Sequence, residues 1–209
     1  MSIAENIKHY QSQMPAQTEL IAVSKTKPIE DLQQAYDAGQ RLFGENKALE
    51  MRDKYEALPK DILWHFIGHL QTNKVKYIVP FVAMIHSVDS LKLLCEINKE
   101  AKKCGRVVDC LLQVDIAHEE TKFGMEDEQI EQLLISETFK ELENVRICGL
   151  MGIGSITDDM NQTQKEFHHL QELFKRIKER FFQNKDSFKH LSMGMSHDYE
   201  VAISEGSTL

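Results

Sequence analysis

The sequence has few cysteines and no long apolar run. Its four cysteines, Cys95, Cys104, Cys110 and Cys148, form no C-x-x-C pair and follow no metal-ligand spacing, which argues against a disulfide scaffold and a zinc module. No apolar run approaches the roughly 20 residues that span a bilayer, and the polar N-terminus lacks the apolar core of a signal peptide. These absences indicate a cytoplasmic protein with reduced, packed thiols.

Basic residues are also scarce. The chain has 25 Lys and Arg against 33 Asp and Glu, and its formal net charge is -8. We therefore expect neither a nucleic-acid nor a membrane partner, because nothing supplies a basic footprint. One small anion such as phosphate can still bind, since backbone amides and a single lysine suffice for it. Walker-type loops, H-E-x-x-H motifs and a Ser-His-Asp order are absent as well.

A short apolar run, a polar turn and a helical stretch recur seven times along the 209 residues. This pattern predicts strands at 19–25, 41–45, 63–69, 84–87, 107–116, 146–152 and 190–195. Helices are predicted at 29–38, 47–58, 72–80, 91–104, 127–142, 161–182 and 198–204. Such alternation requires a parallel sheet covered by helices. No Pro/Gly-rich linker divides the chain, so we expect one domain over residues 1–209.

Two α/β architectures fit this alternation, an open doubly wound sheet and a TIM-type (β/α)8 barrel. No G-x-G-x-x-G opens the first helix, which weakens the dinucleotide-binding version of the open sheet. A barrel also gathers the carboxyl ends of its strands into the ring where barrel active sites lie. Polar residues stand at these ends: Lys25, Asn46, His69, Asp115, Ser155 and Ser196. We predict the barrel, with its eighth strand missing from this chain.

The first predicted strand ends in a lysine. Lys25 and Lys27 share the parity of Ile21 and Val23, so both lysines face the barrel interior if those apolar residues do, with Lys25 deeper and Lys27 at the rim. A partly desolvated lysine has a lowered pKa, and its neutral amine can attack a carbonyl carbon. The alternative is an ordinary strand-end lysine that reaches water, which on these residues alone is the more common case.

Four other residues are candidates for a site. Asn46 ends the segment FGEN and either offers its amide to a ligand or caps the next helix. His65 in LWHFIGH is either a ring contact or a core histidine, and on a strand it lies more than about 13 Å from His69, too far to share a metal ion. Met151 in GLMGIGS suits an apolar floor. Ser196 in MGMSHD either caps the following helix or holds an anion there. The KFG segment at 122–124 is a candidate rim loop.

Five segments taken together carry a family resemblance: AVSKTKP, FGEN, WHFIGHLQTNK, GLMGI and SMGMSHDYEVAISEGST occur in this order. Over positions 20–209 the chain closely resembles the pyridoxal 5'-phosphate homeostasis proteins. The resemblance implies a fold-type III, pyridoxal phosphate (PLP)-binding barrel like the N-terminal domain of alanine racemase, with PLP at its open end. It makes Lys25 the Schiff-base lysine. The other positions that it assigns to the cofactor are Asn46, His65 and Met151, with Ser196 as a phosphate ligand.

The resemblance also implies a role. It points to a carrier or buffer that takes part in intracellular PLP homeostasis, with PLP and PLP-dependent apoenzymes as partners, no defined catalytic activity and a monomeric state. A PLP-dependent amino-acid racemase is the alternative, and it requires a second acid–base residue opposite Lys25. A phosphate-sugar-binding barrel would leave Lys25 as a charge donor only. Because family members continue after GST with a Val-Arg-Ile-Gly-type strand, we expect weaker phosphate binding here and exposed edges at the first and seventh strands.

Overall fold

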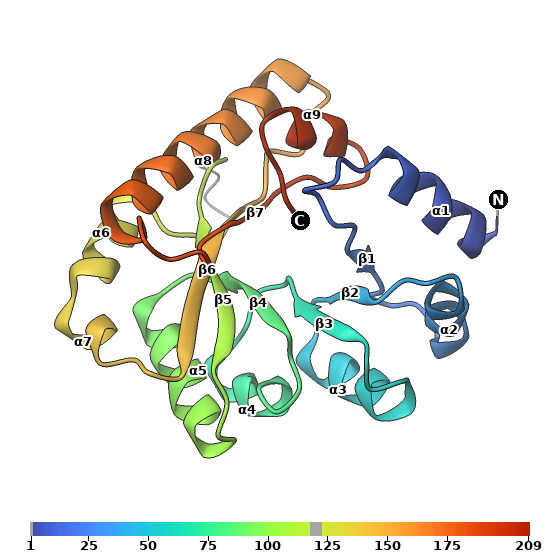
Figure 1. Cartoon of the computed structure of the whole chain (residues 1–209), viewed down its shortest axis with the longest axis horizontal. Helices are drawn as coiled ribbons and strands as arrows, with labels where there is room; N and C mark the ends of the chain where they lie inside the picture. Colours follow the sequence, from blue (N-terminus) through green and yellow to red (C-terminus); the bar gives the residue numbers. More distant parts are fainter. Residues whose placement is uncertain (1, 118–122) are drawn as a thin grey trace.

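Seven short apolar strands form one parallel sheet whose order follows the sequence. The structure, a computed structural model, describes residues 2–117 and 123–209. Each strand pairs in parallel with the next along the chain. Figure 1 shows the sheet curled around a centre with helices outside it. The strands are β1 (Ala22–Val23), β2 (Leu42–Glu45), β3 (Leu63–Phe66), β4 (Met84–Val88), β5 (Val108–Val114), β6 (Val145–Gly152) and β7 (His190–Ser192).

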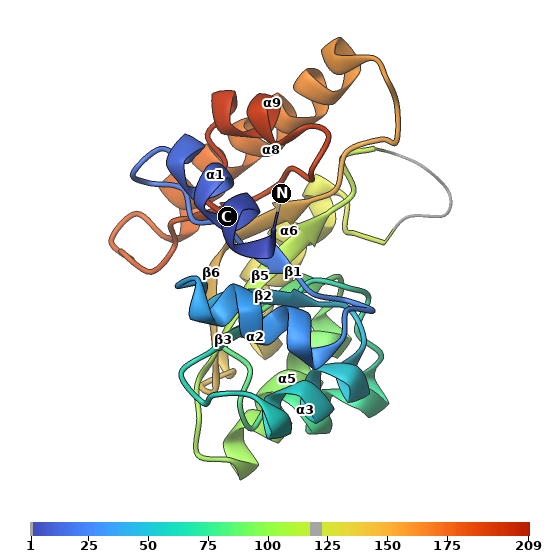
Figure 2. The same cartoon turned by 90° about the vertical axis from the view of Figure 1, so that its right-hand side faces the viewer.

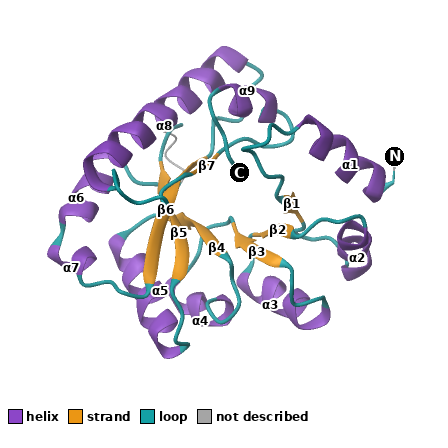
Figure 3. Cartoon of the chain, in the orientation of Figure 1, coloured by secondary structure: helices purple, strands orange, loops and turns teal. Residues whose placement is uncertain are grey.

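Helices cover the outer face of this sheet, which is the arrangement that right-handed crossovers between parallel strands produce (Figure 3). Turned by 90°, the molecule shows α1 and α2 in front of β1 and β2 (Figure 2). The helices are α1 (Ile3–Gln13), α2 (Ile29–Asp37), α3 (Ala48–Ala57), the 3-10 turn η1 (Thr72–Lys74), α4 (Val75–Ile78), α5 (Leu91–Lys103), α6 (Asp127–Ile135), α7 (Glu137–Lys140), α8 (Met160–Phe181) and α9 (Tyr199–Ser204).

Strand residues divide between two apolar layers because successive side chains point to opposite faces. The larger layer lies between the sheet and the helices and holds fully buried side chains such as Trp64, Phe66 and Ile85. A smaller cluster fills the inside of the curled sheet: Met84, Leu111, Cys148 and Met151. The barrel interior is therefore packed with side chains at this level, as in barrels of the TIM type.

The sheet is curled but its edge strands, β1 and β7, do not pair with each other. No eighth strand is present in the described part of the chain, as predicted. The last residues nevertheless bridge part of the gap, because the Thr208 N–H donates to the Leu191 carbonyl at 2.9 Å and the Glu19 N–H donates to the Thr208 carbonyl at 3.0 Å. The two predicted free edges are thus tied together at one point, close to the C-terminus (Figure 1).

Several element boundaries differ from the prediction. Strands expected to reach Lys25 and His69 end at Val23 and Phe66. The helix predicted over 127–142 is two helices, because the Ser136 hydroxyl accepts the Phe139 N–H at 3.2 Å and begins α7.

The helix α1 was not predicted. Ser2 and Glu5 form a capping box at its start, and this S-x-x-E spacing was a visible signal in the sequence.

All four cysteines are free. Cys110 and Cys148 are buried as expected, whereas Cys104 is exposed, so the prediction that every thiol is packed was wrong for Cys104. Within residues 2–117 and 123–209, no helix combines the length and the apolar content that crossing a membrane requires.

Candidate functional site

Lys25 lies in a tight turn directly after β1. The Lys27 N–H donates to the Ser24 carbonyl at 3.1 Å, and Thr26 has a φ of 64°. A positive φ at the third residue is the feature of a type II turn, in which Lys25 is the second residue. Lys25 and Lys27 are both exposed. The strand ends at Val23, so strand alternation does not extend to the two lysines, and their direction toward the barrel interior stays a prediction.

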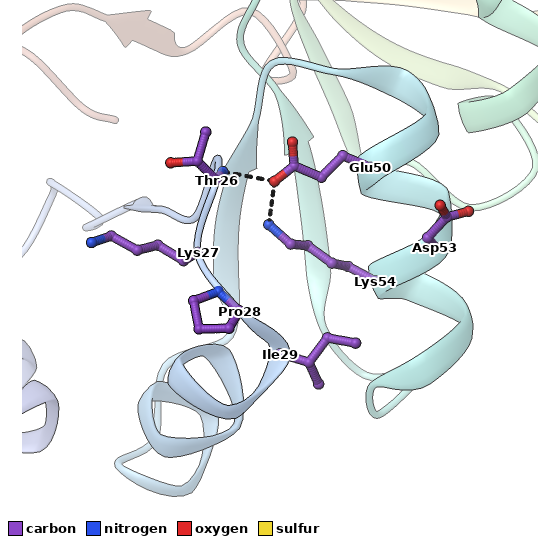
Figure 4. Close-up of a pocket in the computed structure, with 7 residues that line it drawn as sticks. All are labelled: Thr26, Lys27, Pro28, Ile29, Glu50, Asp53 and Lys54. Atoms are coloured by element: carbon purple, nitrogen blue, oxygen red, sulfur yellow. Dashed lines mark hydrogen bonds and ion pairs between the residues drawn. The ribbon is translucent and has the colours of Figure 1, made fainter.

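A buried network of charges lies beneath this turn. Lys54 on α3 has a side chain only 6% exposed, and its ammonium donates to three acceptors, each at 2.7 Å: the Ser24 carbonyl, Glu45 Oε1 and Glu50 Oε1. Glu50 Oε1 also accepts the Thr26 N–H at 2.7 Å, and Figure 4 shows this carboxylate between the turn and Lys54. This network was not predicted, although the i,i+4 spacing of Glu50 and Lys54 is a signal visible in the sequence.

Asn46 follows β2 at the same end of the sheet. Its side-chain Oδ1 is buried and finds no hydrogen-bond partner in the described part of the chain. The backbones of Asn46 and Gly68 are so close that a Cβ on Gly68 would lie 2.4 Å from the Asn46 Cβ. Lys47, and not Asn46, is the N-cap residue of α3, so the capping alternative was wrong. Asn46 therefore keeps a buried acceptor free at the carboxyl end of β2.

The floor of the barrel is crossed by a chain of hydrogen bonds. His65 Nδ1 lies 2.8 Å from His86 Nε2, and His86 Nδ1 lies 2.9 Å from Ser192 Oγ on β7. Burial, together with electrostatic repulsion by the His190 ring, lowers the pKa of His65 to about 4. Burial lowers the pKa of His86 well below its ordinary value for the same reason, with His65 as a further cause. Both rings are therefore neutral near pH 7. A single proton lies in each of the two hydrogen bonds, with one atom as donor and the other as acceptor.

Met151 occupies the floor and Ser196 the rim. In the strand register Met151 lies between Gln113 on β5 and Ser192 on β7, and it is buried. Ser196 is exposed in the turn before α9. Asp198 is the N-cap residue of that helix, so the capping alternative for Ser196 was wrong.

Three further side chains meet at the rim. His69 Nδ1 lies 3.1 Å from Asp89 Oδ2, and the His69 ring stacks on Phe123 with 3.7 Å between the ring centroids. The Phe123 carbonyl in turn accepts a hydrogen bond from Gln113 Nε2 at 2.9 Å. Of the predicted rim loop, Lys122 lies outside the described residues. Asp89 and Gln113 were not predicted, because nothing in their local sequence marks them.

The arrangement combines an exposed primary amine, a buried amide oxygen that lacks a partner, an exposed hydroxyl and a neutral floor. A primary amine can react with an aldehyde, and an apolar floor suits a flat ring. In the described part of the chain no group of His, Cys, Asp and Glu side chains could hold a metal ion. This end of the barrel is therefore suited to a small organic ligand that carries a carbonyl group.

Comparison with known proteins places the chain in a family. The family described as the alanine racemase N-terminal domain matches residues 1–208. Pyridoxal phosphate homeostasis proteins of Aquifex aeolicus and Helicobacter pylori are 44% and 40% identical to the chain over 191 and 194 residues. The chain belongs to the pyridoxal phosphate homeostasis protein family. Each alignment covers 91% of this chain and 82% of the relative.

Solved structures agree with this family assignment. PipY of Synechococcus elongatus PCC7942, solved without PLP, superposes with a TM-score of 0.92 and is 35% identical, over 99% of this chain and 95% of its own. The same protein with PLP bound gives a TM-score of 0.88. Alanine racemase from E. faecalis, at 16% identity and a TM-score of 0.67, covers 82% of this chain and 48% of its own, and shares the fold.

Proposed function

We propose that this chain binds pyridoxal 5'-phosphate at the carboxyl ends of its strands and holds it as a Schiff base on Lys25. Its role would be that of a carrier or buffer in PLP homeostasis. Two findings support the proposal: relatives at 44% and 40% identity are named for PLP homeostasis, and the similar PipY was solved with PLP bound. The observation that carries it is the primary amine of Lys25, exposed in the turn after β1, while the neighbouring strand β2 is followed by the free acceptor of Asn46.

The residues at this end of the barrel fit PLP. When bound, PLP supplies an aldehyde that a primary amine converts reversibly into a Schiff base, with release of one water. Lys25 provides that amine, and Asn46 Oδ1, buried without a partner, offers an acceptor to a polar group of the ligand. Met151 and the neutral His65 provide a floor without formal charge. Ser196 offers a hydroxyl for the phosphate.

A buffering role agrees with the exposure of Lys25. Water and competing amines can reach an exposed lysine, so the bond at Lys25 can be broken as readily as it is formed. We propose PLP-dependent apoenzymes as recipients, a monomeric protein and a cytoplasmic location. The racemase alternative requires a second acid–base group facing Lys25. The histidines on the floor suit that role poorly, because they are bonded to each other and burial lowers their pKa, so that they accept a proton weakly.

The test is an absorbance spectrum of the protein mixed with PLP, before and after borohydride. We expect a visible absorbance band that borohydride removes. Reduction fixes PLP to the lysine, and mass spectrometry should find it on the peptide that contains Lys25. Lys25→Ala should abolish the band, and Lys27→Ala, which alters another exposed lysine two residues away, should retain it. A band that persists in Lys25→Ala would refute the assignment. Turnover of L- or D-alanine by the loaded protein would favour the racemase alternative.

A further inference from the structure

We propose that Lys54, together with Glu45 and Glu50, is a positioning unit that fixes the backbone on both sides of Lys25. This inference rests on the proposed function of Lys25. None of the three residues is itself expected to touch PLP. They act on the turn, and the turn determines where the amine of Lys25 can reach.

The first step is the peptide group that precedes Lys25. Its carbonyl belongs to Ser24 and accepts the Lys54 ammonium at 2.7 Å and the Lys27 N–H at 3.1 Å, so both lone pairs are used. The Ser24 hydroxyl donates to Glu45 Oε1 at 2.7 Å, and Glu45 is fully buried. A buried charge pair that also binds backbone restricts this peptide group more than an exposed lysine could.

The second step is the peptide group that follows Lys25. Its N–H belongs to Thr26 and donates to Glu50 Oε1 at 2.7 Å. Thr26 has a φ of 64°, a conformation that a β-branched residue rarely adopts and that persists only when its surroundings hold it. The Glu50 carboxylate is the group that holds it here, and Lys54 holds that carboxylate in turn at 2.7 Å (Figure 4).

The two steps together clamp Lys25 from both sides. Lys54 reaches the carbonyl before Lys25 directly and the N–H after it through Glu50. All three N–H bonds of the Lys54 ammonium are used, and its side chain is 6% exposed, so the ammonium has no freedom to leave. The backbone of Lys25 is thus ordered before a ligand arrives, and only its side chain must be ordered on binding. Such preorganisation lowers the cost of binding without any contact to the ligand.

The experiment compares PLP with pyridoxine 5'-phosphate, which has an alcohol in place of the aldehyde and cannot bond to Lys25. Glu50→Ala removes the anchor of the Thr26 N–H. We expect it to weaken PLP binding about tenfold, which corresponds to about 1.4 kcal/mol, and to change the affinity for pyridoxine phosphate less than twofold. Glu50→Gln keeps an acceptor for the Thr26 N–H and should recover most of the loss. Asp53→Ala, on the same helix and outside the network, is the matched control.

The outcomes separate this inference from the proposed function. Equal losses for both ligands in Glu50→Ala mean a general structural role and overturn the inference, as does an unchanged affinity for PLP. If the wild type gives no borohydride-sensitive band, or Lys25→Ala keeps it, the proposed function fails instead. If Glu50→Ala does not fold, Glu50→Asp replaces it, because this variant keeps the charge but withdraws the carboxylate by one methylene. The test is again whether the affinity for PLP falls more than the affinity for pyridoxine phosphate. Amide exchange of the native protein is a second measurement: protection of the exposed Thr26 N–H supports the clamp, and fast exchange contradicts it.

Discussion

Acidification from pH 7.5 to 5.5 should destabilise this fold through the histidines of the barrel floor. His65 and His86 are buried and bonded to each other at 2.8 Å. The pKa of His65 is lowered to about 4 by burial and by His190, and burial lowers that of His86 well below its ordinary value. An unfolded histidine titrates near pH 6.5. Between these values the unfolded chain binds protons that the folded chain does not, so the free energy of unfolding decreases as the pH falls.

The size of the effect follows from the width of this pH range. Above about pH 7.5 both states are neutral at these two rings, and neither contributes to a pH dependence. Between pH 7.5 and 5.5, one histidine that protonates only in the unfolded state lowers the free energy of unfolding by about 1.4 kcal/mol. The pair together should lower it by roughly 3 kcal/mol, a large part of the usual stability of a domain. The lowered pKa of His190, which is partly buried, acts in the same direction.

Urea unfolding at several pH values measures this directly. Trp64 is the only tryptophan and is fully buried next to His65, so its fluorescence reports the loss of the core. His86→Gln removes one titrating ring and should reduce the pH dependence by about 1.4 kcal/mol. His9→Gln, an exposed histidine on α1, should leave it unchanged. The reasoning is wrong if the wild type loses less than about 1 kcal/mol over this range, or if His86→Gln keeps the full dependence.

Two glycines provide further tests. Gly149→Ala should lower the free energy of unfolding by at least about 3 kcal/mol, because its Cβ would lie 1.7 Å from the His190 carbonyl oxygen between β6 and β7. Urea unfolding measures this loss. A urea midpoint within 0.3 M of the wild type, which corresponds to roughly 1 kcal/mol or less, would contradict the packing. Gly68→Ala should displace the Asn46 backbone, 2.7 Å from the added Cβ, and weaken PLP binding about tenfold in a titration. Gly105→Ala is its control, because a Cβ there meets nothing within 4 Å and costs about 1 kcal/mol through its φ of 62° alone.

The fold was predictable because it depends on periodicity. Seven alternations of an apolar run and a helical stretch led to the order and parallel pairing of the strands, since the crossover rules leave few alternatives. The ends of the elements were predicted less well. The apolar run before Lys25 continues the strand pattern, but the Glu50 carboxylate and Lys54 hold the backbone in a turn there. A contact across 24 residues decided that boundary, and local sequence contains no sign of it.

The residues of the candidate site were likewise predictable only in part. Lys25, Asn46 and Ser196 could be named because polar residues follow apolar runs at the carboxyl ends of predicted strands. Their supports could not be named. His86 and Ser192 are separated by 106 residues, and only the closing of the sheet brings them together. His86 follows an apolar run in IHSVD, where a histidine is as consistent with an exposed strand end as with the floor of a barrel.

Near the site, the charged side chains of Lys54 and Glu45 lie on the outer face of the sheet, and the side chains on the inner face are neutral. Next to the site, the inside of the sheet holds the neutral rings of His65 and His86 and the buried side chain of Met151, because burial disfavours a charge there. The ion pairs next to the site lie on the outer face, where α3 supplies Lys54 to Glu45. An anionic ligand at the mouth therefore meets the neutral His65 and His86 and the apolar Met151 below it. Its negative charge must be balanced at the rim by exposed lysines and backbone amides, and added salt screens charges in that position most strongly.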